Sequence, residues 1–462
     1  MMQFIEMKLT EEKENLKIAV FGAGYVGLVT GVCLANVGNS VFCIDKDREK
    51  IESIMNGEIP IYEPGLKDLI NNCCEKESLH FTVNATETIK SVSCCIIAVG
   101  TPRLEDGSAD LRSVYEVALV IGKNMDSDML VIDKSTVPPG TSYIVKSTIE
   151  KELLERGVQY TVNVASVPEF LKEGVAIADC ASPDRIIIGA SDNYTIDLVR
   201  EIYAPFVSRS DRFIVMDPVS AEMTKYVANA MLASRISFMN EIAGICETVG
   251  ADVNMVRRGI GSDKRIGDRF LYAGCGYGGS CFPKDISALI YTAKENGCQT
   301  RILEQIDAVN TYQKHLLADK VVKRFGKNLC GMKFAIWGVS FKPNTDDIRE
   351  APALVIIDDL LLYGANVTVY DPIAMENARI QYFGEKVSYS KSKYTALEGA
   401  DALLLITEWG EFRSPDFEEM KKLLHNPVIF DGRNQYNHKT LYELGFEYYP
   451  VGYGSVINTS DV

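Results

Sequence analysis

The sequence lacks the features that would place the protein in a membrane or outside the cell. None of its apolar runs reaches the roughly 18 to 20 uncharged residues that span a bilayer. The N-terminal stretch MMQFIEMKLTEEKENLK has neither the basic flank nor the apolar core of a signal peptide. The 12 cysteines contain no C-x-x-C, and the four histidines stand apart from them, which disfavours zinc sites and disulfide frameworks. We therefore expect a cytoplasmic protein that holds no metal.

Positive charge is also scarce. The 48 lysines and arginines are outnumbered by 63 aspartates and glutamates, which gives a formal net charge of −15. This balance argues against nucleic acid or an anionic membrane as a partner, so any anionic small molecule must be held by local positive groups. The 462 residues are 47% hydrophobic and 24% charged, as in soluble globular proteins. At roughly 150 residues for each domain, the length predicts two or three domains.

The N-terminal region contains a glycine-rich turn between a strand and a helix. Residues 17–22 (KIAVFG) are typical of a buried parallel strand, and an apolar helical stretch follows the turn as far as about Asn36. A second strand, SVFCID, ends at Asp45. This order of elements within ~30 residues is the dinucleotide-binding fingerprint in its proper context. The residues of the turn are Gly22, Ala23, Gly24, Tyr25, Val26 and Gly27.

Asp45 indicates which dinucleotide the site prefers. Its carboxylate can accept hydrogen bonds from ribose hydroxyls and would repel a 2′-phosphate, so we expect NAD rather than NADP. The alternative is a tight turn in a Rossmann domain that binds no cofactor. Further strands at 94–99, 129–133 and 161–166, separated by helical segments, extend the pattern to an NAD-binding domain at residues 15–212.

The rest of the chain repeats this plan with one change. Residues 220–249 have apolar residues at helical spacing and no proline, which predicts a long helix within a helical connector at 213–328. A second strand, turn, helix and strand begin at residue 333 and open a domain at 329–462. The first turn of this domain, Gly338-Val339-Ser340-Phe341-Lys342, has lost the glycine spacing, so we expect a different ligand there. The fold class predicted is α/β, with two Rossmann-like doubly wound parallel-sheet domains joined by a long central helix.

The segment GCGYGGSCFPKD, residues 274–285, carries the clearest indication of chemistry. Pro283 suits the first turn of a helix, which places Cys281 just ahead of a helix N-terminus, where a thiolate is favoured. A thiolate beside a nicotinamide suggests covalent oxidation of an aldehyde through a thiohemiacetal and a thioester. The alternative is a buried structural cysteine, which the neighbouring glycines and Asp285 argue against.

Several motifs together resemble the UDP-glucose/GDP-mannose dehydrogenase family, in order from about Leu16 to Tyr436. The resemblance implies that one active site oxidises a nucleotide sugar twice, from primary alcohol to carboxylate, and reduces two NAD. A GGSC loop, rather than a GGHC-type loop, is similar to the members that convert UDP-glucose to UDP-glucuronate; the alternatives are GDP-mannose and an N-acetylated UDP-hexosamine. The motifs are FGAGYVGL, AVGTP, STVPPGT, VPEFLKEG, the Lys225/Asn229 pair, RIGDRFL, GYGGSCFPKD and SFKPNTDDIREAP.

The resemblance implies a role for each catalytic residue. Cys281 would be the nucleophile, and Asp285 would act with Lys225 and an ordered water in proton transfer at the sugar hydroxyl. Asn229 follows Lys225 by four residues, so the long helix presents both on one face. Glu169 would activate the water that hydrolyses the thioester. We expect the same helical spacing to pair Glu169 with the glutamate four residues later.

The resemblance also assigns binding residues. Thr136 would help to hold the hydrolytic water and lie beside the cofactor. In the family the equivalent of Arg265 reaches a neighbouring subunit's site, which implies a homodimer or a higher homo-oligomer. The residues implied around NAD are Gly22, Gly24, Tyr25, Val26, Gly27, Asp45, Thr101, Thr136, Glu173 and Arg349. Those implied around the nucleotide sugar are Glu169, Phe170, Leu171, Lys225, Asn229, Arg265, Phe270, Tyr272, Gly278, Lys342 and Arg433.

Two other functions share part of the pattern. A two-electron 3-hydroxyacid dehydrogenase also combines a Rossmann domain with a long helix that carries lysine and asparagine, but it needs no cysteine and no second Rossmann-like domain. A catalytically silent NAD-binding or scaffold protein would be favoured by loss of Cys281, Lys225 or Asp285, and all three are present.

Overall fold

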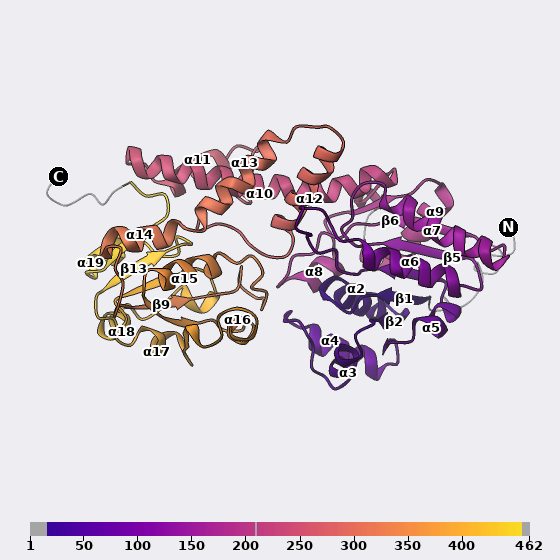
Figure 1. The fold of residues 1–462 in the computed structure, drawn as a ribbon, viewed down its shortest axis with the longest axis horizontal. Helices are drawn as coiled ribbons and strands as arrows, with labels where there is room; N and C mark the ends of the chain where they lie inside the picture. The colour runs from indigo at the N-terminus through magenta and orange to yellow at the C-terminus, as the bar shows by residue number, and fades with distance from the viewer. Residues whose placement is uncertain (1–15, 208–209, 455–462) are drawn as a thin grey trace. The chain divides into compact units, whose positions relative to one another are not determined.

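The computed structural model describes residues 16–207 and 210–454, which form two compact units (Figure 1). The first unit contains the described residues up to Leu104 together with Ala109–Lys225. The second contains the short loop Glu105–Ser108 together with the described residues from Tyr226 onward. Within the described ranges, no helix is long and apolar enough to cross a membrane.

The first unit is built on one sheet with the strand order β3-β2-β1-β4-β5-β6-β7-β8. Neighbouring strands from β3 to β6 run parallel. The chain enters at the centre of the sheet and returns to it at the switch between β1 and β4, where ligands bind in folds of this kind. The strands are β1 (Lys17–Phe21), β2 (Ser40–Ile44), β3 (Leu79–Thr82), β4 (Cys94–Ile97), β5 (Met129–Asp133), β6 (Val162–Ser166), β7 (Ile186–Gly189) and β8 (Phe213–Met216).

Both faces of this sheet are covered by helices. Ile18 and Val20 of β1 belong to a core with α2, α4, α8 and α9, whereas Ala19 and Phe21 belong to a core with α5, α6 and α7. Burial on both faces explains why the central strands are continuous apolar runs. The helices are α2 (Tyr25–Asn36), α3 (Arg48–Met55), α4 (Leu66–Glu75), α5 (Ala85–Ser91), α6 (Arg112–Asn124), α7 (Thr141–Arg156), α8 (Ala176–Ala181) and α9 (Asn193–Tyr203).

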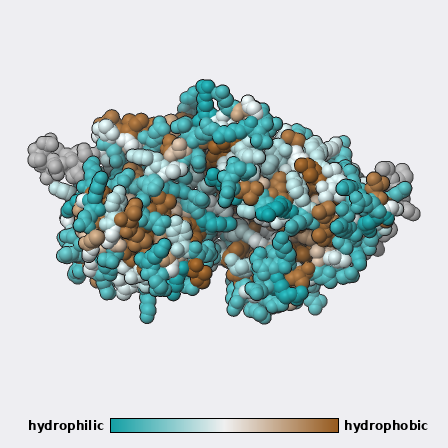
Figure 2. Space-filling model, in the orientation of Figure 1, coloured by the Kyte–Doolittle hydropathy of each residue, from teal (hydrophilic) through white to brown (hydrophobic). Residues whose placement is uncertain are grey.

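The long helix α10 (Pro218–Val249) begins in the first unit and continues in the second. Four more helices follow before the second sheet: α11 (Val253–Gly261), α12 (Phe282–Glu295), α13 (Arg301–Gln313) and α14 (Leu316–Phe325). The loop Glu105–Ser108 belongs to this unit because it lies on α12, where Ser287 Oγ donates to Gly107 O at 3.0 Å. In the view of Figure 2 the surfaces are mainly hydrophilic with scattered apolar patches.

The second sheet has the order β11-β10-β9-β12-β13-β14, and its neighbouring strands all run parallel. Counted from its own first strand, this is the order of the first six strands of the other sheet. Phe334 and Ile336 face one core, and Ala335 and Trp337 face the other. The elements are β9 (Lys333–Trp337), α15 (Pro352–Leu362), β10 (Asn366–Tyr370), α16 (Met375–Ala378), β11 (Ser388–Tyr389), α17 (Lys393–Leu397), β12 (Ala402–Leu405), α18 (Phe417–Leu423), β13 (Val428–Asp431), α19 (His438–Glu443) and β14 (Glu447–Pro450).

The predicted fold class is confirmed, with a difference at one sheet edge. β7 pairs antiparallel with β6, through Ser166 and Gly189, and β8 runs parallel to β7. The last two strands therefore reverse the direction of the rest, an arrangement that is common at the edge of doubly wound sheets. The sequence did not predict β3, β7, β8, β11 and β14. Four of these are edge strands that are only partly buried, whereas β7 is buried throughout but is only four residues long.

Candidate active site

The glycine turn of the first unit combines tight packing with open space. A Cβ atom at Gly22, where φ is +105°, would lie 2.5 Å from the carbonyl oxygen of Ala98, and one at Gly27 would lie 1.8 Å from that of Gly22. A Cβ atom at Gly24 would meet nothing within 4 Å. Gly24 also precedes α2 without a side-chain cap. The amides of this helix N-terminus can therefore be approached by a phosphate.

Asp45 forms the acidic corner beside this turn. Its carboxylate accepts hydrogen bonds from Ala23 N at 2.9 Å, Asp47 N at 3.0 Å and Lys50 Nζ at 2.9 Å. Burial alone would raise the pKa of Asp45, but the Lys50 ammonium and the two amides outweigh it and lower the pKa. An ionised acceptor at the end of β2 suits ribose hydroxyls. The open approach at Gly24 and this carboxylate therefore fit NAD.

A buried glutamate links the glycine turn to a distant loop. The hydroxyl of Tyr25 donates to Glu63, and Glu63 also accepts from Gly174 N at 2.6 Å and from Ala176 N at 2.7 Å. Burial, followed by the hydrogen bond to Glu63, raises the pKa of Tyr25, so the phenol remains protonated. Glu63 thus holds the segment that precedes α8 against the residue at the centre of the turn.

The segment after β6 is not helical, so the prediction that Glu169 and Glu173 share a helix face is wrong. Residues 167–175 form an irregular segment with a turn, and α8 begins only at Ala176. Leu171 N donates to Glu169 Oε2 at 2.6 Å, while the amides of Gly174 and Ala176 are bound by Glu63. Side-chain carboxylates therefore satisfy backbone groups that a helix would have paired internally.

Lys225 and Glu169 form a buried ion pair in the first unit. The distance from Lys225 Nζ to Glu169 Oε1 is 3.2 Å, and the two side chains are 5% and 7% exposed. Lys225 Nζ also lies 5.2 Å from the centre of the Phe170 ring. The structure therefore brings together Lys225, Glu169, Phe170 and Leu171, four of the residues that the sequence implied. Such a desolvated ammonium can stabilise a developing oxyanion.

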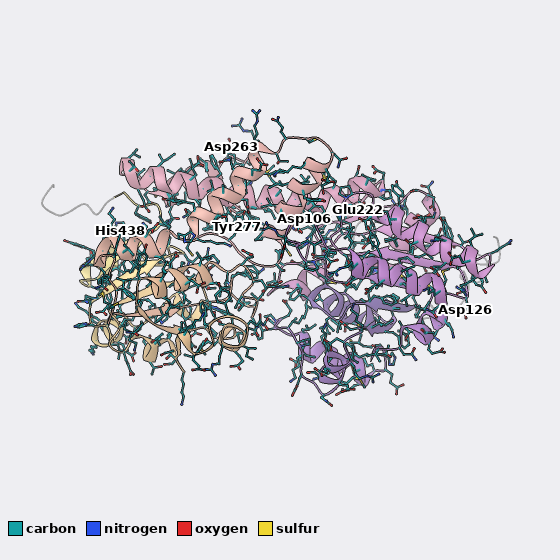
Figure 3. All side chains as sticks on the ribbon, in the orientation of Figure 1. Asp106, Asp126, Glu222, Asp263, Tyr277 and His438 are labelled. Carbon is teal, nitrogen blue, oxygen red and sulfur yellow. The ribbon has the colours of Figure 1, made fainter. Side chains whose placement is uncertain are left out.

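The loop that carries Thr136 is fastened at both ends. Thr101 Oγ1 donates to Thr136 O at 2.8 Å. At the start of α7, Gly140 N and Ser142 N donate to the buried carboxylate of Glu222 at 2.5 and 2.8 Å. Glu222 is labelled in Figure 3. Burial raises the pKa of Glu222, although these amides act in the other direction. Glu222 precedes Lys225 by three residues on α10, so one helix anchors this loop and carries the lysine.

In the second unit, Cys281 is the N-cap residue of α12, with Pro283 in the first turn, as predicted. Asp285 N donates to Cys281 O at 2.8 Å. The side chain of Asp285 is fully buried, and it accepts from Asn229 Nδ2 and from Lys284 Nζ, each at 2.6 Å. The structure therefore joins Asn229 of α10 to the carboxylate that lies one turn beyond the cysteine.

The backbone that leads to Cys281 is bound from several sides. Gly274 N donates to Asn240 Oδ1 at 2.9 Å, and Cys275 N donates to Gly432 O at 2.9 Å. Gly279 N donates to Arg349 O at 2.8 Å. A Cβ at Gly278 would lie 2.3 Å from Glu350 O, so glycine is required there. This loop therefore has one well-determined course.

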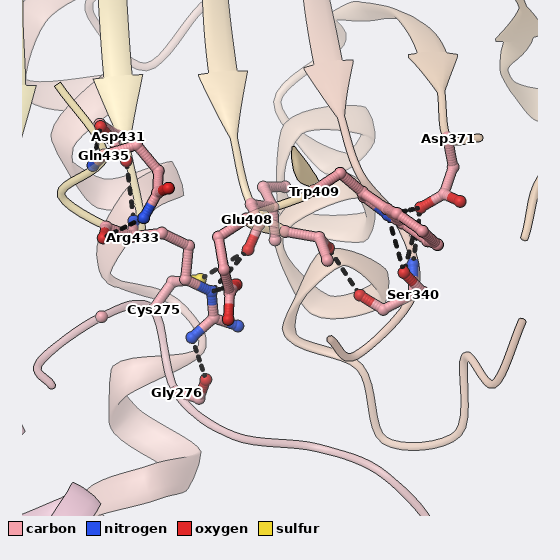
Figure 4. Close-up of polar contacts among 12 residues, drawn as sticks. Cys275, Gly276, Ser340, Asp371, Glu408, Trp409, Asp431, Arg433 and Gln435 are labelled. Carbon is pink, nitrogen blue, oxygen red and sulfur yellow. Dashed lines mark hydrogen bonds and ion pairs between the residues drawn. The ribbon is translucent and has the colours of Figure 1, made fainter. Parts of the chain in front are cut away.

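Arg433 follows β13 and reaches the same loop (Figure 4). Its Nε donates to Ile406 O at 2.7 Å, and its Nη1 donates to Gly276 O at 3.1 Å. The Arg433 Nε also lies 3.1 Å from Glu408 Oε2 in an ion pair, with the arginine side chain 16% exposed. The guanidinium thus lies at the carboxyl end of the second sheet, where ligands of such sheets bind.

Two predicted arginines point to solvent. The side chain of Arg265 is 89% exposed and pairs with Asp263 at 2.5 Å, two residues away. That of Arg349 is 62% exposed and pairs with Asp347 at 2.7 Å. The high exposure of the Arg265 side chain keeps its guanidinium outside the buried clusters described above.

Three further predicted residues lie on loops of the second unit. Phe270 has a φ of +60°, which is unusual for a bulky side chain. Tyr272 is 61% exposed and stacks under Arg257, whose guanidinium carbon is 4.2 Å from the ring centre. Lys342 Nζ lies 5.1 Å from the ring of Phe341.

The comparisons with known proteins agree over the whole described chain. Models of the UDP-glucose/GDP-mannose dehydrogenase family match its NAD binding domain at residues 16–207, its central domain at 219–312 and its UDP binding domain at 335–438. The chain is 46% identical to a UDP-glucose 6-dehydrogenase of Pseudomonas aeruginosa over 95% of its own length and 97% of that protein.

Two solved structures resemble it closely. One is a UDP-glucose dehydrogenase of Pyrobaculum islandicum, with 34% identity, a TM-score of 0.87 and coverage of 96% of this chain and 100% of that one. The other is a UDP-D-ManNAc dehydrogenase of Pyrococcus horikoshii, with 26% identity, a TM-score of 0.82 and the same coverage.

Proposed function

The chain belongs to the UDP-glucose/GDP-mannose dehydrogenase family, with its NAD binding domain present, and from this premise we propose that it oxidises UDP-glucose to UDP-glucuronate. The reaction would use two NAD and one water and would pass through a thiohemiacetal and a thioester on Cys281. In this proposal, residues 15–212 bind NAD, 213–328 form the connector and dimer contact, and 329–462 bind the UDP moiety. A cytoplasmic location is part of the same proposal.

One observation carries the proposal beyond the family relationship. Cys281 occupies a helix N-terminus, and the fully buried carboxylate one turn later is already held by Asn229. A simple alcohol dehydrogenase has no use for a cysteine in that place. Because Lys225 and Asn229 are four residues apart on α10, this helix can present both to one sugar.

The first oxidation needs a base and a stabilised oxyanion. We assign proton removal from the C6 hydroxyl to Asp285, acting with Lys225 and a water, while the Lys225 ammonium stabilises the alkoxide. NAD, when bound, accepts a hydride from the sugar carbon in each oxidation. Gly22, Gly24, Tyr25, Val26, Gly27, Asp45, Thr101, Thr136, Glu173 and Arg349 are the residues proposed to hold and orient it.

The second half of the reaction depends on the thiol. Cys281 Sγ would form a bond to the aldehyde carbon while the carbonyl π bond breaks and the oxygen takes up the thiol proton; loss of a hydride to a second NAD and of the hydroxyl proton to a base would then turn this thiohemiacetal into a thioester. Glu169 then takes a proton from water, which attacks the thioester carbon, and the carbon–sulfur bond breaks to release carboxylate and thiol. The ion pair with Lys225 holds the Glu169 carboxylate next to the ammonium that we assign to the developing oxyanion.

Recognition of the nucleotide sugar is assigned to both units. The Phe170 ring lies 5.2 Å from Lys225 Nζ, and Leu171 N donates to Glu169 Oε2. Arg433 lies at the carboxyl end of the second sheet. Together with Glu169, Asn229, Arg265, Phe270, Tyr272, Gly278 and Lys342, they supply the cations and backbone groups that a diphosphate and a uracil require.

We also propose a homodimer. Val227, Met231, Phe238 and Ile245 of α10 are 46%, 59%, 57% and 51% exposed, and their spacing of four, seven and seven residues aligns them on one stripe. An apolar stripe of this kind favours association with a second helix. The exposed Arg265 is free of the clusters of its own chain and suits a role in a partner's site.

The proposal is tested by assaying the purified protein with NAD and a panel of nucleotide sugars. The panel contains UDP-glucose, UDP-galactose, UDP-N-acetylglucosamine and GDP-mannose. Complete conversion of limiting UDP-glucose should yield two NADH for each sugar, without free aldehyde. A ratio of one would overturn the four-electron reaction, and faster turnover of an acetamido sugar or GDP-mannose would reassign the substrate.

A further inference from the structure

The face of α13 that meets the cysteine loop carries three buried polar side chains. Asn310, Gln313 and Lys314 follow one another at i, i+3 and i+4, which places them side by side. They are only 3%, 4% and 7% exposed. The large majority of polar side chains buried to this degree have hydrogen-bond partners. None of the three belongs to the residues assigned above to catalysis or binding.

Asn310 binds both backbone groups of one residue in the loop. Tyr277 N donates to Asn310 Oδ1 at 2.9 Å, and Asn310 Nδ2 donates to Tyr277 O at 3.1 Å. The first group belongs to the peptide before Tyr277 and the second to the peptide after it. A single side chain therefore fixes two successive peptide planes, as a neighbouring strand does in an antiparallel ladder.

The other two side chains hold the surroundings of this contact. Gln313 Nε2 donates to Gly274 O at 2.7 Å. Lys314 Nζ donates to Glu350 Oε2 at 2.9 Å, and the backbone of Glu350 lies against the opposite side of the loop at Gly278. One face of α13 thus fixes the loop at two points and also holds the wall on which the loop rests.

We propose that Asn310 is a positioning residue for the reaction, because it sets the course of the loop that delivers Cys281. The proposal rests on the proposed function of Cys281 as the nucleophile. Three residues separate Tyr277 from Cys281, and rotation of either peptide plane at Tyr277 would displace the thiol. A displacement of about 1 Å can reduce an enzymatic rate by roughly 100-fold.

Two substitutions separate the halves of the contact. Asn310→Asp keeps the acceptor for Tyr277 N but replaces the donor to Tyr277 O with a carboxylate oxygen, which repels that carbonyl. Asn310→Ala removes both hydrogen bonds. Gln305 is an exposed residue of the same helix, so Gln305→Glu and Gln305→Ala are the matched controls. The first measurement is the rate of Cys281 alkylation by iodoacetamide at several pH values, with the modified residue identified by mass spectrometry.

In both Asn310 variants we expect the curve of alkylation rate against pH to change, with a rate at pH 7 that differs from that of the parent by at least about fivefold. In both Gln305 variants the curve should be unchanged. With UDP-glucose, kcat should fall about 10- to 100-fold in the Asn310 variants while KM for NAD stays within about twofold, because the contact lies wholly within the second unit. Asn310→Ala should be the more affected of the two.

An unchanged alkylation curve together with a lower melting temperature would show that Asn310 only supports folding, and would overturn the proposal. If both Asn310 variants fail to fold, Gln313→Met removes only the donor to Gly274 O and should give a smaller displacement of the same kind; an unchanged curve would then overturn the proposal. Alkylation needs neither sugar nor cofactor, so it remains decisive if UDP-glucose is not the substrate.

Discussion

Each of the two sheets has an equivalent turn after its first strand, but the residues around this turn differ between the sheets. Gly22 N donates to Ile44 O at 2.7 Å in the first unit, and Gly338 N donates to Tyr370 O at 2.8 Å in the second. Each glycine has a positive φ, +105° and +92°. In both units the strand therefore turns in the same way toward the end of its neighbour, and an aspartate follows that neighbour.

The two aspartates have different neighbours. Asp45 accepts from one amide of the glycine turn and from Lys50 at its edge. Asp371 is fully buried, and it accepts from Val339 N, Ser340 N and Ser340 Oγ and from the indole Nε1 of Trp409 (Figure 4). The corner that we propose faces a ribose in the first unit is thus filled by an indole in the second.

This comparison shows that two sheets with the same strand order at their centres can have different side chains around the same corner. In the second unit the aspartate at this corner, Asp371, is used in hydrogen bonds within the protein. A cationic side chain, Arg433, lies after β13. Fold alone therefore does not identify the ligand of a Rossmann-like sheet. The side chains at the carboxyl ends of its strands do.

The largest expected effect tests whether the units serve different steps. Cys281→Ala should abolish UDP-glucuronate formation and leave NAD binding intact. Glu169→Gln should slow only the final hydrolysis, by about 10²- to 10⁴-fold, so that about two NADH appear in a burst for each site. Intact-mass spectrometry should then detect a UDP-sugar adduct on Cys281.

The exposed Cys298 provides the control for that experiment, because Cys298→Ala should behave as the parent protein does. Glu169→Gln with weak substrate binding but neither burst nor adduct would identify Glu169 as a positioning group, and the hydrolytic base would have to be another residue.

The next effect contrasts the two aspartates in stability. Asp371→Asn turns an amide toward buried donors and should destabilise the second unit by about 3 kcal/mol or more. Asp45→Asn loses an ion pair near the surface and should cost about 0–1 kcal/mol. Hydrogen exchange reports the unfolding free energy of each unit separately, so it measures the loss of stability caused by each of the two substitutions. Equal losses would mean that the two corners are equivalent.

The preference for NAD over NADP also distinguishes the two aspartates. Asp45→Asn should narrow the preference for NAD over NADP by roughly tenfold or more, about 1.4 kcal/mol, whereas Asp371→Asn should leave it unchanged. The lowered pKa of Asp45 keeps its carboxylate ionised as pH falls to its ordinary value of 3.8, so the preference of the parent should persist across the acidic range and fade only below that value. Comparable catalytic efficiencies with NAD and NADP in the parent would contradict the assignment.

The smallest expected change is a partial recovery of activity when two inactive variants are mixed, one of them at the exposed Arg265. Chains with Arg265→Ala and chains with Cys281→Ala should each be inactive, and mixing them should restore part of the activity. Recovery is expected because some hybrid sites would draw an intact residue from each subunit. No recovery in demonstrably mixed dimers would place Arg265 within its own chain's site or outside the reaction.

Much of the fold could be predicted because it depends on local pattern. The buried strands at β1, β4, β5, β9, β12 and β13 are short apolar runs, and the helix start at Pro283 follows from the geometry of proline. The helix expected at Glu169 was wrong because Glu63, more than 100 residues earlier, binds amides of that segment. The spacing of residues within a segment cannot reveal a hydrogen-bond partner that is so distant in the sequence.

The same limit explains which site residues were missed. Cys281 and Asp285 carry a recognisable neighbourhood in the chain, and the fingerprint glycines define their own turn. Glu63, Glu222 and Asn310 act through backbone groups that are distant in sequence, and each occurs in an ordinary loop or helix pattern. Asn310 lies beside two other buried polar residues, Gln313 and Lys314, and such a group of polar residues at helical spacing is a signal that the sequence offers for it.

The loop Glu105–Ser108, which lies on α12, has a consequence for any attempt to divide the protein genetically. The chain leaves the first unit after Leu104, returns to it at Ala109 and leaves it again after Lys225. A gene fragment that ends at Lys225 would therefore encode the first unit together with four residues that belong to its neighbour, and the complementary fragment would lack them. The two units are not exchangeable cassettes, and chimaeras between relatives should be joined so that this loop and α12 come from the same parent.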